Sequence, residues 1–323
     1  MKPLIFLGAG GHSRVLLDIA TLRGFKVLGF SVPDKSESEI MGYPVLGNDD
    51  NILSRDPSEA LLVNGLGSIV SLERRFEVYD RFSRNGFHFA TLIHPSAVVA
   101  EGCDLGEGVQ VMAGAIIQPG SSVGENSIVN TRAAIDHDCI IGSHVHVCPG
   151  VTLSGGVKIG TCAHIGTGAT IIQSLTVGEW SLVGAGSVVI RNVGNRQMVV
   201  GVPAKVVKTM RDWKKLLVSP SASIREVIDV INREAMQIAL VVDESNHLLG
   251  SVTDGDIRRA LLADSSLEVP ISSVMNTRTI TLKEKANRNI VLAFMRDNHV
   301  HQIPIVDNQK RVVGLELLEN LLF

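Results

Sequence analysis

The sequence predicts a mixed fold of three parts: a small α/β domain, a long β-helix and a second α/β domain. Strand, glycine-turn and helix patterns alternate before residue 90, and an aliphatic residue recurs every six positions from Ile93 to Val189. A helix–strand–turn–strand pattern then occurs twice in the last hundred residues. We place the domains at 1–90, 91–207 and 223–323, with a linker at 208–222. A chain of 323 residues is long enough for two or three separate cores.

The composition describes a folded, soluble protein and limits its partners. Hydrophobic residues make up 45% of the chain and charged residues 20%. A net charge of -3 offers no basic face for nucleic acid. The four cysteines form no Cys-x-x-Cys pair, which indicates small buried residues in a reducing compartment and no metal site. No apolar run reaches the ~20 residues that span a bilayer, so we expect a cytoplasmic protein.

The N-terminal residues predict a strand, a glycine turn and a helix in succession. Residues 2–7 form the strand, Gly8-Ala-Gly-Gly-His12 the turn, 15–20 the helix and 26–30 a second strand. Free backbone N–H groups at such a helix N-terminus favour an anion. As a dinucleotide fingerprint the turn is weak, because Ser13 stands where the third glycine belongs, so a turn that is merely tight remains an alternative. Residues 61–68 repeat the strand and glycine turn, and a helix follows at 72–85. We therefore expect a ligand at the strand C-termini.

The central stretch has a period of six residues. We call every sixth residue from Ile93 to Val189 the ladder. All seventeen ladder residues are aliphatic, and no insertion breaks the period. Short strands and tight turns around an inward aliphatic residue give this period, which is the hexapeptide β-helix signature. If three hexads close one coil, residues eighteen apart stack on each other. Gly155 then lies over His137 and leaves open space beside it. His146 lies half a coil from His137, so the two can share a site only across a subunit boundary.

The C-terminal part predicts a duplicated unit. The composition of residues 205–220 indicates a short helix and a linker. Helices are expected at 224–233, 255–262 and 287–297, and strands at 238–242, 248–252, 302–306 and 312–315. Val241 and Ile305 occupy the same place in the two repeats, 64 residues apart. A repeat of this size fits a paired module that buries one shared face.

Four motifs resemble those of the bacterial sugar O-/N-acyltransferases, and the match covers residues 1–207. This family includes the UDP-4-amino-sugar N-acetyltransferases of bacillosamine and legionaminic acid synthesis and the sialic acid O-acetyltransferases. The resemblance implies a Rossmann-like N-terminal domain that binds a nucleotide-sugar, a left-handed parallel β-helix and acetyl-CoA as donor. It also implies an obligate homotrimer with active sites between subunits. The motifs are Gly8-Ala-Gly-Gly-His12, His94-Pro-Ser-Ala97, Asn130-Thr-Arg-Ala-Ala-Ile-Asp-His-Asp138 and Gly201-Val-Pro-Ala-Lys205.

The same resemblance assigns roles to individual residues. It makes His137 the general base and Asp138 the residue that tunes it. Thr167 and Ala185 are eighteen apart, so they should stack into one groove for a pantetheine arm. The implied nucleotide-sugar contacts are Gly10, Gly11, His12, Gly65 and Gly67, and the implied acetyl-CoA contacts are His146, Thr167 and Ala185.

Two features qualify these assignments. Ser31 and Val32 stand where the family has an acidic pair, which leaves open whether the nucleotide is UDP, GDP, CMP or none. A metal site made of His137, His144 and His146 is disfavoured, because His137 lies half a coil from His146.

The last hundred residues resemble a CBS-domain pair of the kind that precedes sugar-phosphate nucleotidyltransferase domains. The similarity lies in Gly250-Ser-Val-Thr-Asp-Gly-Asp-Ile-Arg-Arg259. In such modules a Gly-h-h-Ser/Thr-x-x-Asp run contacts the ribose and phosphates of an adenine nucleotide, and Thr253 and Asp256 satisfy it. The second repeat has Leu317 and Asn320 at these places. At most one intact site for ATP or AMP is therefore expected.

The sequence thus predicts an acetyl-CoA-dependent N-acetyltransferase acting on the 4-amine of a nucleotide-linked 4-amino-4,6-dideoxy sugar. Surface glycan synthesis of the bacillosamine or legionaminic acid type is the expected setting, and adenine nucleotide at the CBS pair is expected to modulate the enzyme. Sialic acid O-acetylation is the alternative activity. A third hypothesis is a non-catalytic trimeric scaffold that senses nucleotide.

Overall fold

The computed structural model of the protein describes residues 2–33, 38–67, 72–209, 212–234, 236–283, 288–298 and 300–318. The chain divides into two compact units, residues 1–210 and 211–323. Each unit has hydrophobic cores of its own. In the described part of the chain, every helix is too short or too polar to cross a membrane.

The first unit begins with a five-stranded sheet in the order β3-β4-β2-β1-β5. Strands β1 (Leu4–Leu7), β2 (Val27–Ser31), β4 (Tyr43–Gly47) and β5 (Leu61–Asn64) are parallel, and β3 (Glu39–Ile40) is antiparallel to β4. The predicted strands and helices of this domain are confirmed. Strands β3 and β4 and the short helix α2 (Asp49–Leu53) had not been predicted.

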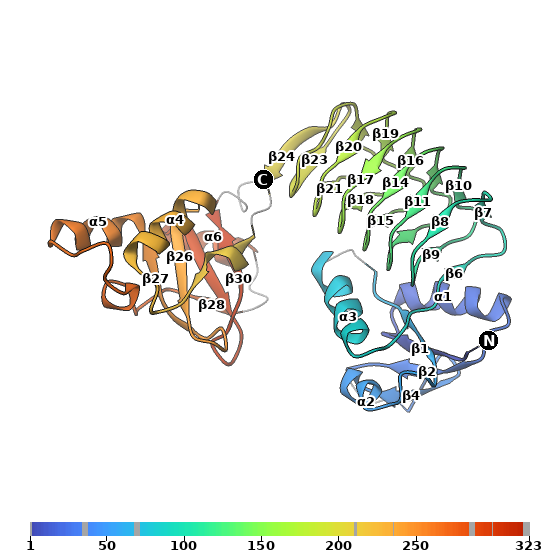
Figure 1. Ribbon diagram of the computed structural model, residues 1–323, viewed down its shortest axis with the longest axis horizontal. Helices are drawn as coiled ribbons and strands as arrows, with labels where there is room; N and C mark the ends of the chain where they lie inside the picture. Colours follow the sequence, from blue (N-terminus) through green and yellow to red (C-terminus); the bar gives the residue numbers. More distant parts are fainter. Residues whose placement is uncertain are drawn as a thin grey trace. The chain divides into compact units, whose positions relative to one another are not determined.

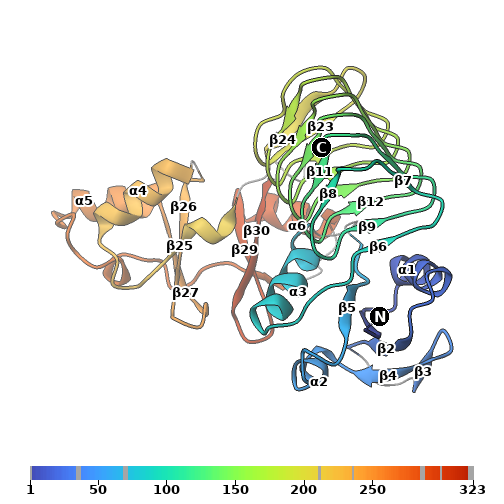
Figure 2. The ribbon, with the colours of Figure 1, turned by 45° about the vertical axis from the view of Figure 1, so that its right-hand side comes forward.

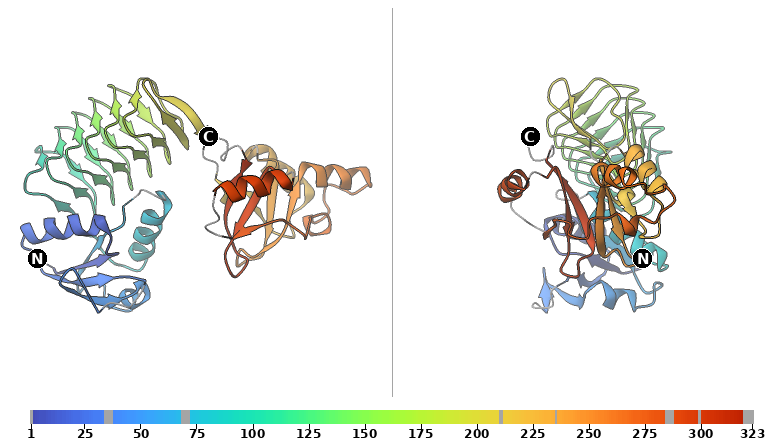
Figure 3. Two further views of the ribbon diagram at one scale, coloured as in Figure 1. Left: turned by 180° about the vertical axis from the view of Figure 1, so that it is seen from behind. Right: turned by 90° about the vertical axis from the view of Figure 1, so that its left-hand side faces the viewer.

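Helices cover both faces of this sheet because the side chains of β1 alternate between them. Leu4 and Phe6 pack against α1 (Gly11–Leu22), and Ile5 and Leu7 lie in the core that includes α3 (Leu72–Arg84). Helix α1 also packs against the first coils of the β-helix, between the sheet and those coils (Figures 1 and 3). The carboxyl ends of β1, β2, β4 and β5 therefore share one edge of the sheet, beside the β-helix.

The β-helix has three faces, wound around a common axis (Figure 2). In each face a strand pairs in parallel with the strand of the next coil, as Ile117 pairs with Ile135 and Val147 with Ile165. The predicted stacking of residues eighteen apart is confirmed. Face 1 comprises β6 (Leu92–Ile93), β9 (Gln110–Val111), β12 (Ile128–Val129), β15 (His146–Val147), β18 (His164–Ile165), β21 (Leu182–Val183) and β23 (Gln197–Val200). Face 2 comprises β7 (Val98–Val99), β10 (Ile116–Ile117), β13 (Ala134–Ile135), β16 (Thr152–Leu153), β19 (Thr170–Ile171) and β22 (Val188–Val189). Face 3 comprises β8 (Asp104–Leu105), β11 (Ser122–Val123), β14 (Ile140–Ile141), β17 (Lys158–Ile159) and β20 (Thr176–Val177).

The six-residue ladder is the core of the β-helix. Ladder residues from Val111 to Val189 are buried, whereas Ile93, Val99 and Leu105 at the open first coil are only partly buried. Residues that precede a ladder position point outward, so face 1 carries Gln110, His146 and His164 on its outer side.

The short helix expected within residues 205–220 is present as a 3-10 helix, but two strands lie beside it where a linker was expected. β24 (Lys205–Thr209) pairs antiparallel with β23 and closes face 1. The 3-10 helix η1 (Trp213–Leu216) and β25 (Leu217–Val218) belong to the second unit, where β25 pairs with β26. Leu216 is fully buried in the core of that unit. The local composition is polar, but the pairing of β24 with β23 and the burial of Leu216 stabilise regular structure there.

The second unit contains two three-stranded sheets of the same design, and the predicted duplication is confirmed. β25, β26 (Ile238–Val242) and β27 (Leu248–Thr253) form one, and β28 (Leu282–Lys283), β29 (Gln302–Val306) and β30 (Val312–Leu317) the other. Val241 pairs with Gly250, and Ile305 pairs with Gly314, in equivalent registers. The helical elements are α4 (Ile224–Glu234), α5 (Asp254–Leu262), η2 (Ile271–Ser273) and α6 (Arg288–Asp297).

Candidate active-site residues

His137 lies at the corner between β13 of face 2 and β14 of face 3. Its Nδ1 is 2.8 Å from Oδ2 of Asp138, which has a left-handed backbone (φ 59°). The side chains are 63% and 72% exposed, so the pair faces outward. The hydrogen bond to Asp138, followed by the charge of Asp136, raises the pKa of His137. With Nδ1 bound to the carboxylate, Nε2 is the nitrogen left to exchange a proton with a ligand.

Gly155 lies directly against the imidazole of His137. A Cβ atom at residue 155 would lie 2.5 Å from Nε2 and 2.7 Å from Cε1 of His137. The expected open space beside the base is therefore filled by the imidazole ring itself, and this expectation was wrong. The stacking was predicted correctly, since the N–H of Gly156 donates to the carbonyl of His137. The eighteen-residue stacking could not predict the direction in which the imidazole ring of His137 points.

The two glycine turns lie together at the sheet edge that faces the β-helix. Ser13 Oγ donates to the carbonyl oxygens of both Gly8 and Gly65 and so ties the turns to each other. Beside Gly10 and Gly11, at the N-terminus of α1, a Cβ would meet nothing within 4 Å. No side chain caps this helix end, so its N–H groups face open space and can bind an anion.

The glycines of the second turn have different surroundings. A Cβ at Gly65 would lie 2.0 Å from Ser13 Oγ, so glycine is required there for packing. Gly67 lies beside His12, since a Cβ added at Gly67 would lie 3.9 Å from the Cβ of His12. The five residues predicted to bind the nucleotide-sugar are thus brought to one place.

His12 and His146 meet at the junction of this edge with face 1. His12 Nε2 is 2.8 Å from Gln110 Oε1, and the ring centroids of His12 and His146 are 6.4 Å apart. Burial lowers the pKa of His12 to about 4 and that of His146 well below its usual value. Both rings are therefore neutral near pH 7. As predicted, His146 and His137 lie on different sides of the coil.

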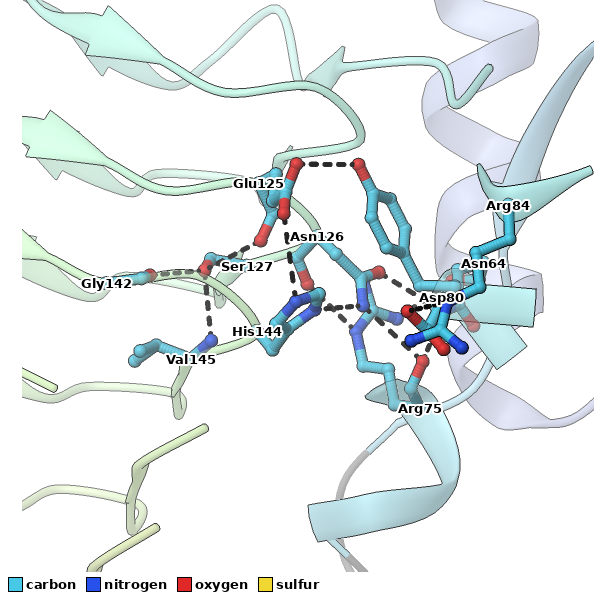
Figure 4. Close-up of polar contacts among 11 residues, drawn as sticks. Asn64, Arg75, Asp80, Arg84, Glu125, Asn126, Ser127, Gly142, His144 and Val145 are labelled. Atoms are coloured by element: carbon cyan, nitrogen blue, oxygen red, sulfur yellow. Dashed lines mark hydrogen bonds and ion pairs between the residues drawn. The ribbon is translucent and has the colours of Figure 1, made fainter. Parts of the chain in front are cut away.

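Arg75 is a residue that the sequence analysis missed. It is buried and donates hydrogen bonds to the carbonyl oxygens of Asn64 (2.9 Å), Leu66 (2.6 Å) and Asn126 (3.1 Å), as Figure 4 shows in part. Burial lowers its pKa to about 9, which leaves it charged at neutral pH. Arg75 therefore fastens the second glycine turn to the β-helix. A charged residue in an amphipathic helix is ordinarily exposed, so the sequence held no signal for this role.

Asp49 is a second missed residue. Its Oδ1 accepts a 2.6 Å hydrogen bond from Ser31 Oγ, at the carboxyl end of β2. Asp49 is the first residue of α2, which follows the neighbouring strand β4. A carboxylate thus does reach the place where the second strand itself offers only Ser31 and Val32.

Thr167 and Ala185 lie exposed at the corner between faces 1 and 2. The N–H of Gly186 donates to the carbonyl of Thr167 at 2.8 Å, so the two turns stack as predicted. His146 lies on face 1, beside this corner but one coil below Thr167.

The second unit contains a pocket of about 490 Å³. Thr253 lines it, together with Ser251, Asp254 and Thr279. Asp256 Oδ2 instead accepts hydrogen bonds from N–H and Oγ1 of Thr253, as the capping box of α5. Asn320 lies outside the described residues.

Comparisons with known proteins divide the chain at the same place as its two units. The family model of the PglD N-terminal domain matches residues 3–79, and that of the CBS domain matches 207–263 and 271–315. The acetyltransferase domain of PglB from Neisseria gonorrhoeae is 35% identical, with a TM-score of 0.60. The match covers 64% of this chain and 100% of that chain.

A second similar structure contains ligands. PerB from Caulobacter crescentus, in complex with CoA and GDP-perosamine, is 34% identical over 64% of this chain and 98% of its own, with a TM-score of 0.60. Curated relatives match over shorter stretches. An uncharacterized protein of Helicobacter pylori is 30% identical over 124 residues, 36% of each chain, and inosine-5'-monophosphate dehydrogenase of Escherichia coli is 30% identical over 98 residues, 20% of that enzyme. This chain spans about a third or less of the length of these two relatives.

Proposed function

The chain belongs to the sugar acetyltransferases that carry a PglD-type N-terminal domain, here joined to a CBS pair, and on this basis we propose an acetyl-CoA-dependent sugar N-acetyltransferase. Its acceptor is the 4-amine of a nucleotide-linked 4-amino-4,6-dideoxy sugar, as used in bacillosamine- or legionaminic acid-type glycans. The observation that carries the proposal is the exposed His137–Asp138 pair on the β-helix corner.

In the proposed reaction His137 acts as the general base. The amine nitrogen attacks the thioester carbonyl, so that a C–N bond forms and the C–S bond breaks. The amine proton passes to Nε2 of His137 and from there to the sulfur of the leaving CoA. Asp138 holds Nδ1 and stabilises the imidazolium, consistent with the raised pKa of His137.

The nucleotide-sugar is proposed to bind at the two glycine turns. The open N-terminus of α1 at Gly10 and Gly11 suits the diphosphate. Asp49 is positioned at the end of β2 to accept hydrogen bonds from a ribose or a base. The GDP-perosamine bound to PerB supports a nucleotide-linked acceptor.

We further propose that the active site forms between subunits of a homotrimer. His137 lies at the corner of faces 2 and 3, whereas His12 and His146 lie at face 1, so a second copy must bring the base to the sugar. Thr167 and Ala185, with His146 beside them, offer an exposed corner for the pantetheine arm of acetyl-CoA. The CoA bound to PerB supports this donor.

The experiment is an acceptor panel. The protein is incubated with acetyl-CoA and UDP-, GDP- and CMP-linked 4-amino sugars or sialic acid, and released thiol is measured. Thiol release with one nucleotide-4-amino sugar is expected, and His137→Ala should abolish it while the oligomer persists. Turnover with sialic acid alone would replace the proposal by O-acetylation, and no turnover with any acceptor would favour a non-catalytic nucleotide-sensing scaffold.

The pocket in the second unit favours an additional, regulatory function. Its lining by Thr253 and other hydroxyl groups suits the ribose and phosphates of an adenine nucleotide such as ATP or AMP. Asp256 contributes by fixing Thr253 at the start of α5. Calorimetry with ATP, AMP and S-adenosylmethionine tests this; heat from none of them would remove the regulatory hypothesis.

A further inference from the structure

Three metal-ligating side chains converge on the outer side of face 1. They are His146 of β15, His164 of the next strand β18, and Cys148, which follows β15. One ligand atom of each lies within 4.8 Å of the corresponding atoms of the others. A metal site of His137, His144 and His146 was disfavoured from the sequence, and the present group has no local sequence signal, because His164 comes sixteen residues after Cys148.

The spacing of the group suits one tetrahedral ion. Cys148 Sγ and His164 Nε2 are 3.3 Å apart. Two ligands of one tetrahedral zinc ion are separated by about 3.6 Å, given Zn–S of ~2.3 Å and Zn–N of ~2.0 Å. The imidazoles of His146 and His164 are close as well, with 5.3 Å between their ring centroids. A small rotation of the His146 side chain would bring its imidazole to a third corner of the tetrahedron.

The surroundings resemble those of a built site. His146 and Cys148 are each only 5% exposed, on a face whose other outward residues include Leu92 and Ile128 in an apolar core. Asn130 lies 3.0 Å from His146 Nε2 and so holds the ring. The backbone N–H of Thr131 donates to Oδ1 of Asn130 at 2.8 Å and so fixes the amide that holds this ring.

We propose that His146, Cys148 and His164 form a binding site for a zinc-type divalent cation on face 1. A thiolate with two imidazoles is a ligand set that suits Zn²⁺. On binding, the S–H bond of Cys148 breaks, the sulfur bonds to the ion and the proton is released to water. His164 is only partly buried, so the fourth position is open to water or to a donor atom of a bound ligand.

The test uses the full chain, stripped of metal and kept reduced, and titrated with Co²⁺. One equivalent per chain should produce a thiolate-to-cobalt charge-transfer band and the intense visible bands of four-coordinate cobalt, and Zn²⁺ should remove both. Cys148→Ser should abolish the charge-transfer band. His164→Asn should weaken binding by more than the roughly 10–100-fold that loss of an outer-shell partner costs.

Cys103→Ser is the matched control, because Cys103 is a partly exposed thiol on another face of the same β-helix. It should leave the titration unchanged. Circular dichroism shows whether each variant is folded. If Cys148→Ser does not fold, His164→Asn provides the test. Absence of the charge-transfer band in the unsubstituted chain, its persistence in folded Cys148→Ser, or its loss in Cys103→Ser would each overturn the proposal. The readout is independent of acetyl transfer.

Discussion

His137 depends on carboxylates that are its neighbours in the sequence. Asp138 binds Nδ1, and Asp136 accepts a hydrogen bond from the backbone N–H of His137. Both raise the pKa of His137, Asp138 more through its hydrogen bond and Asp136 through its charge. A raised pKa makes the base stronger but delays its deprotonation to higher pH.

Asp138→Asn should therefore lower the pKa of His137, and the acid limb of the kcat/KM profile should move to lower pH. A less basic imidazole also accepts the amine proton less readily, so we expect the rate at the optimum to fall about tenfold. Asp136→Asn is the control and should shift the limb in the same direction by less. Profiles measured with acetyl-CoA and the accepted sugar check this; an unmoved acid limb in Asp138→Asn would refute the role of Asp138.

Gly155→Ala should displace the base without disturbing the fold. The new methyl group would overlap Nε2 and Cε1 of His137, both at the exposed corner, and the ring can swing away into solvent. A displacement of about 1 Å can lower turnover by about 100-fold. Thermal melting should stay close to that of the unsubstituted protein. Near-normal turnover would mean that the ring works from another orientation.

Arg75→Met should destabilise the junction of the N-terminal domain and the β-helix. The change removes a donor from the carbonyl oxygens of Leu66 and Asn126, at about 1–3 kcal/mol for a buried one, whereas the carbonyl of Asn64 keeps a hydrogen bond from Gln110 Nε2. Arg81→Met is the matched control on the same helix, since Arg81 forms an exposed ion pair with Asp50 that is worth at most about 1 kcal/mol. Urea unfolding of both variants compares the two losses, and equal losses would contradict the role of Arg75.

At the scale of elements, face 2 differs from face 3 in its outward side chains. Face 2 presents the exposed aliphatic residues Val98 and Ile116 on adjacent coils, whereas face 3 presents Asp104, Ser122 and Lys158 and a single exposed aliphatic residue, Ile140. Two stacked exposed aliphatic residues such as Val98 and Ile116 favour contact with another subunit. His137 lies at the border of these two faces, where a neighbouring copy would have to approach.

Ile116→Asp should therefore weaken the proposed trimer and abolish turnover together. The residue is 37% exposed in the single chain, so the fold should survive, but a carboxylate buried between subunits costs several kcal/mol. Ser122→Asp on face 3 is the control and should leave both properties intact. Analytical ultracentrifugation with parallel assays measures this. A stable, active Ile116→Asp trimer would exclude face 2 from the interface.

At the scale of the molecule, the two compact units match different known proteins. The first corresponds to whole chains such as the PglB acetyltransferase domain, and the second to the CBS models. A protein truncated after residue 209 should therefore fold and keep its turnover. Adenine nucleotide should change the rate of the full chain alone. The same response in the truncated protein would place the effector site in the first unit.

Periodic and local features were readable from the sequence. The ladder, the duplicated second unit and the adjacency of His137 and Asp138 all follow from residues close in the chain or from a fixed repeat. The eighteen-residue stacking followed as well, because a coil of constant length carries its register forward without error. Within residues 205–220 the short helix was predicted, whereas β24 and β25 were missed, since these short strands depend on partners elsewhere.

What the sequence by itself determined is therefore the architecture and the adjacency of His137 and Asp138, the pair proposed to supply the general base. Only the tertiary structure decided that His12 meets Gln110 and His146, that Arg75 is buried, that Asp49 reaches the end of β2 and that Cys148 faces His164. The physical reason is that each of these contacts depends on how the helices pack against the β-helix or on which rotamer a side chain adopts. The angle at which α1 and α3 pack against the β-helix, and the direction of each ring on its face, are set by the whole core and by no local pattern.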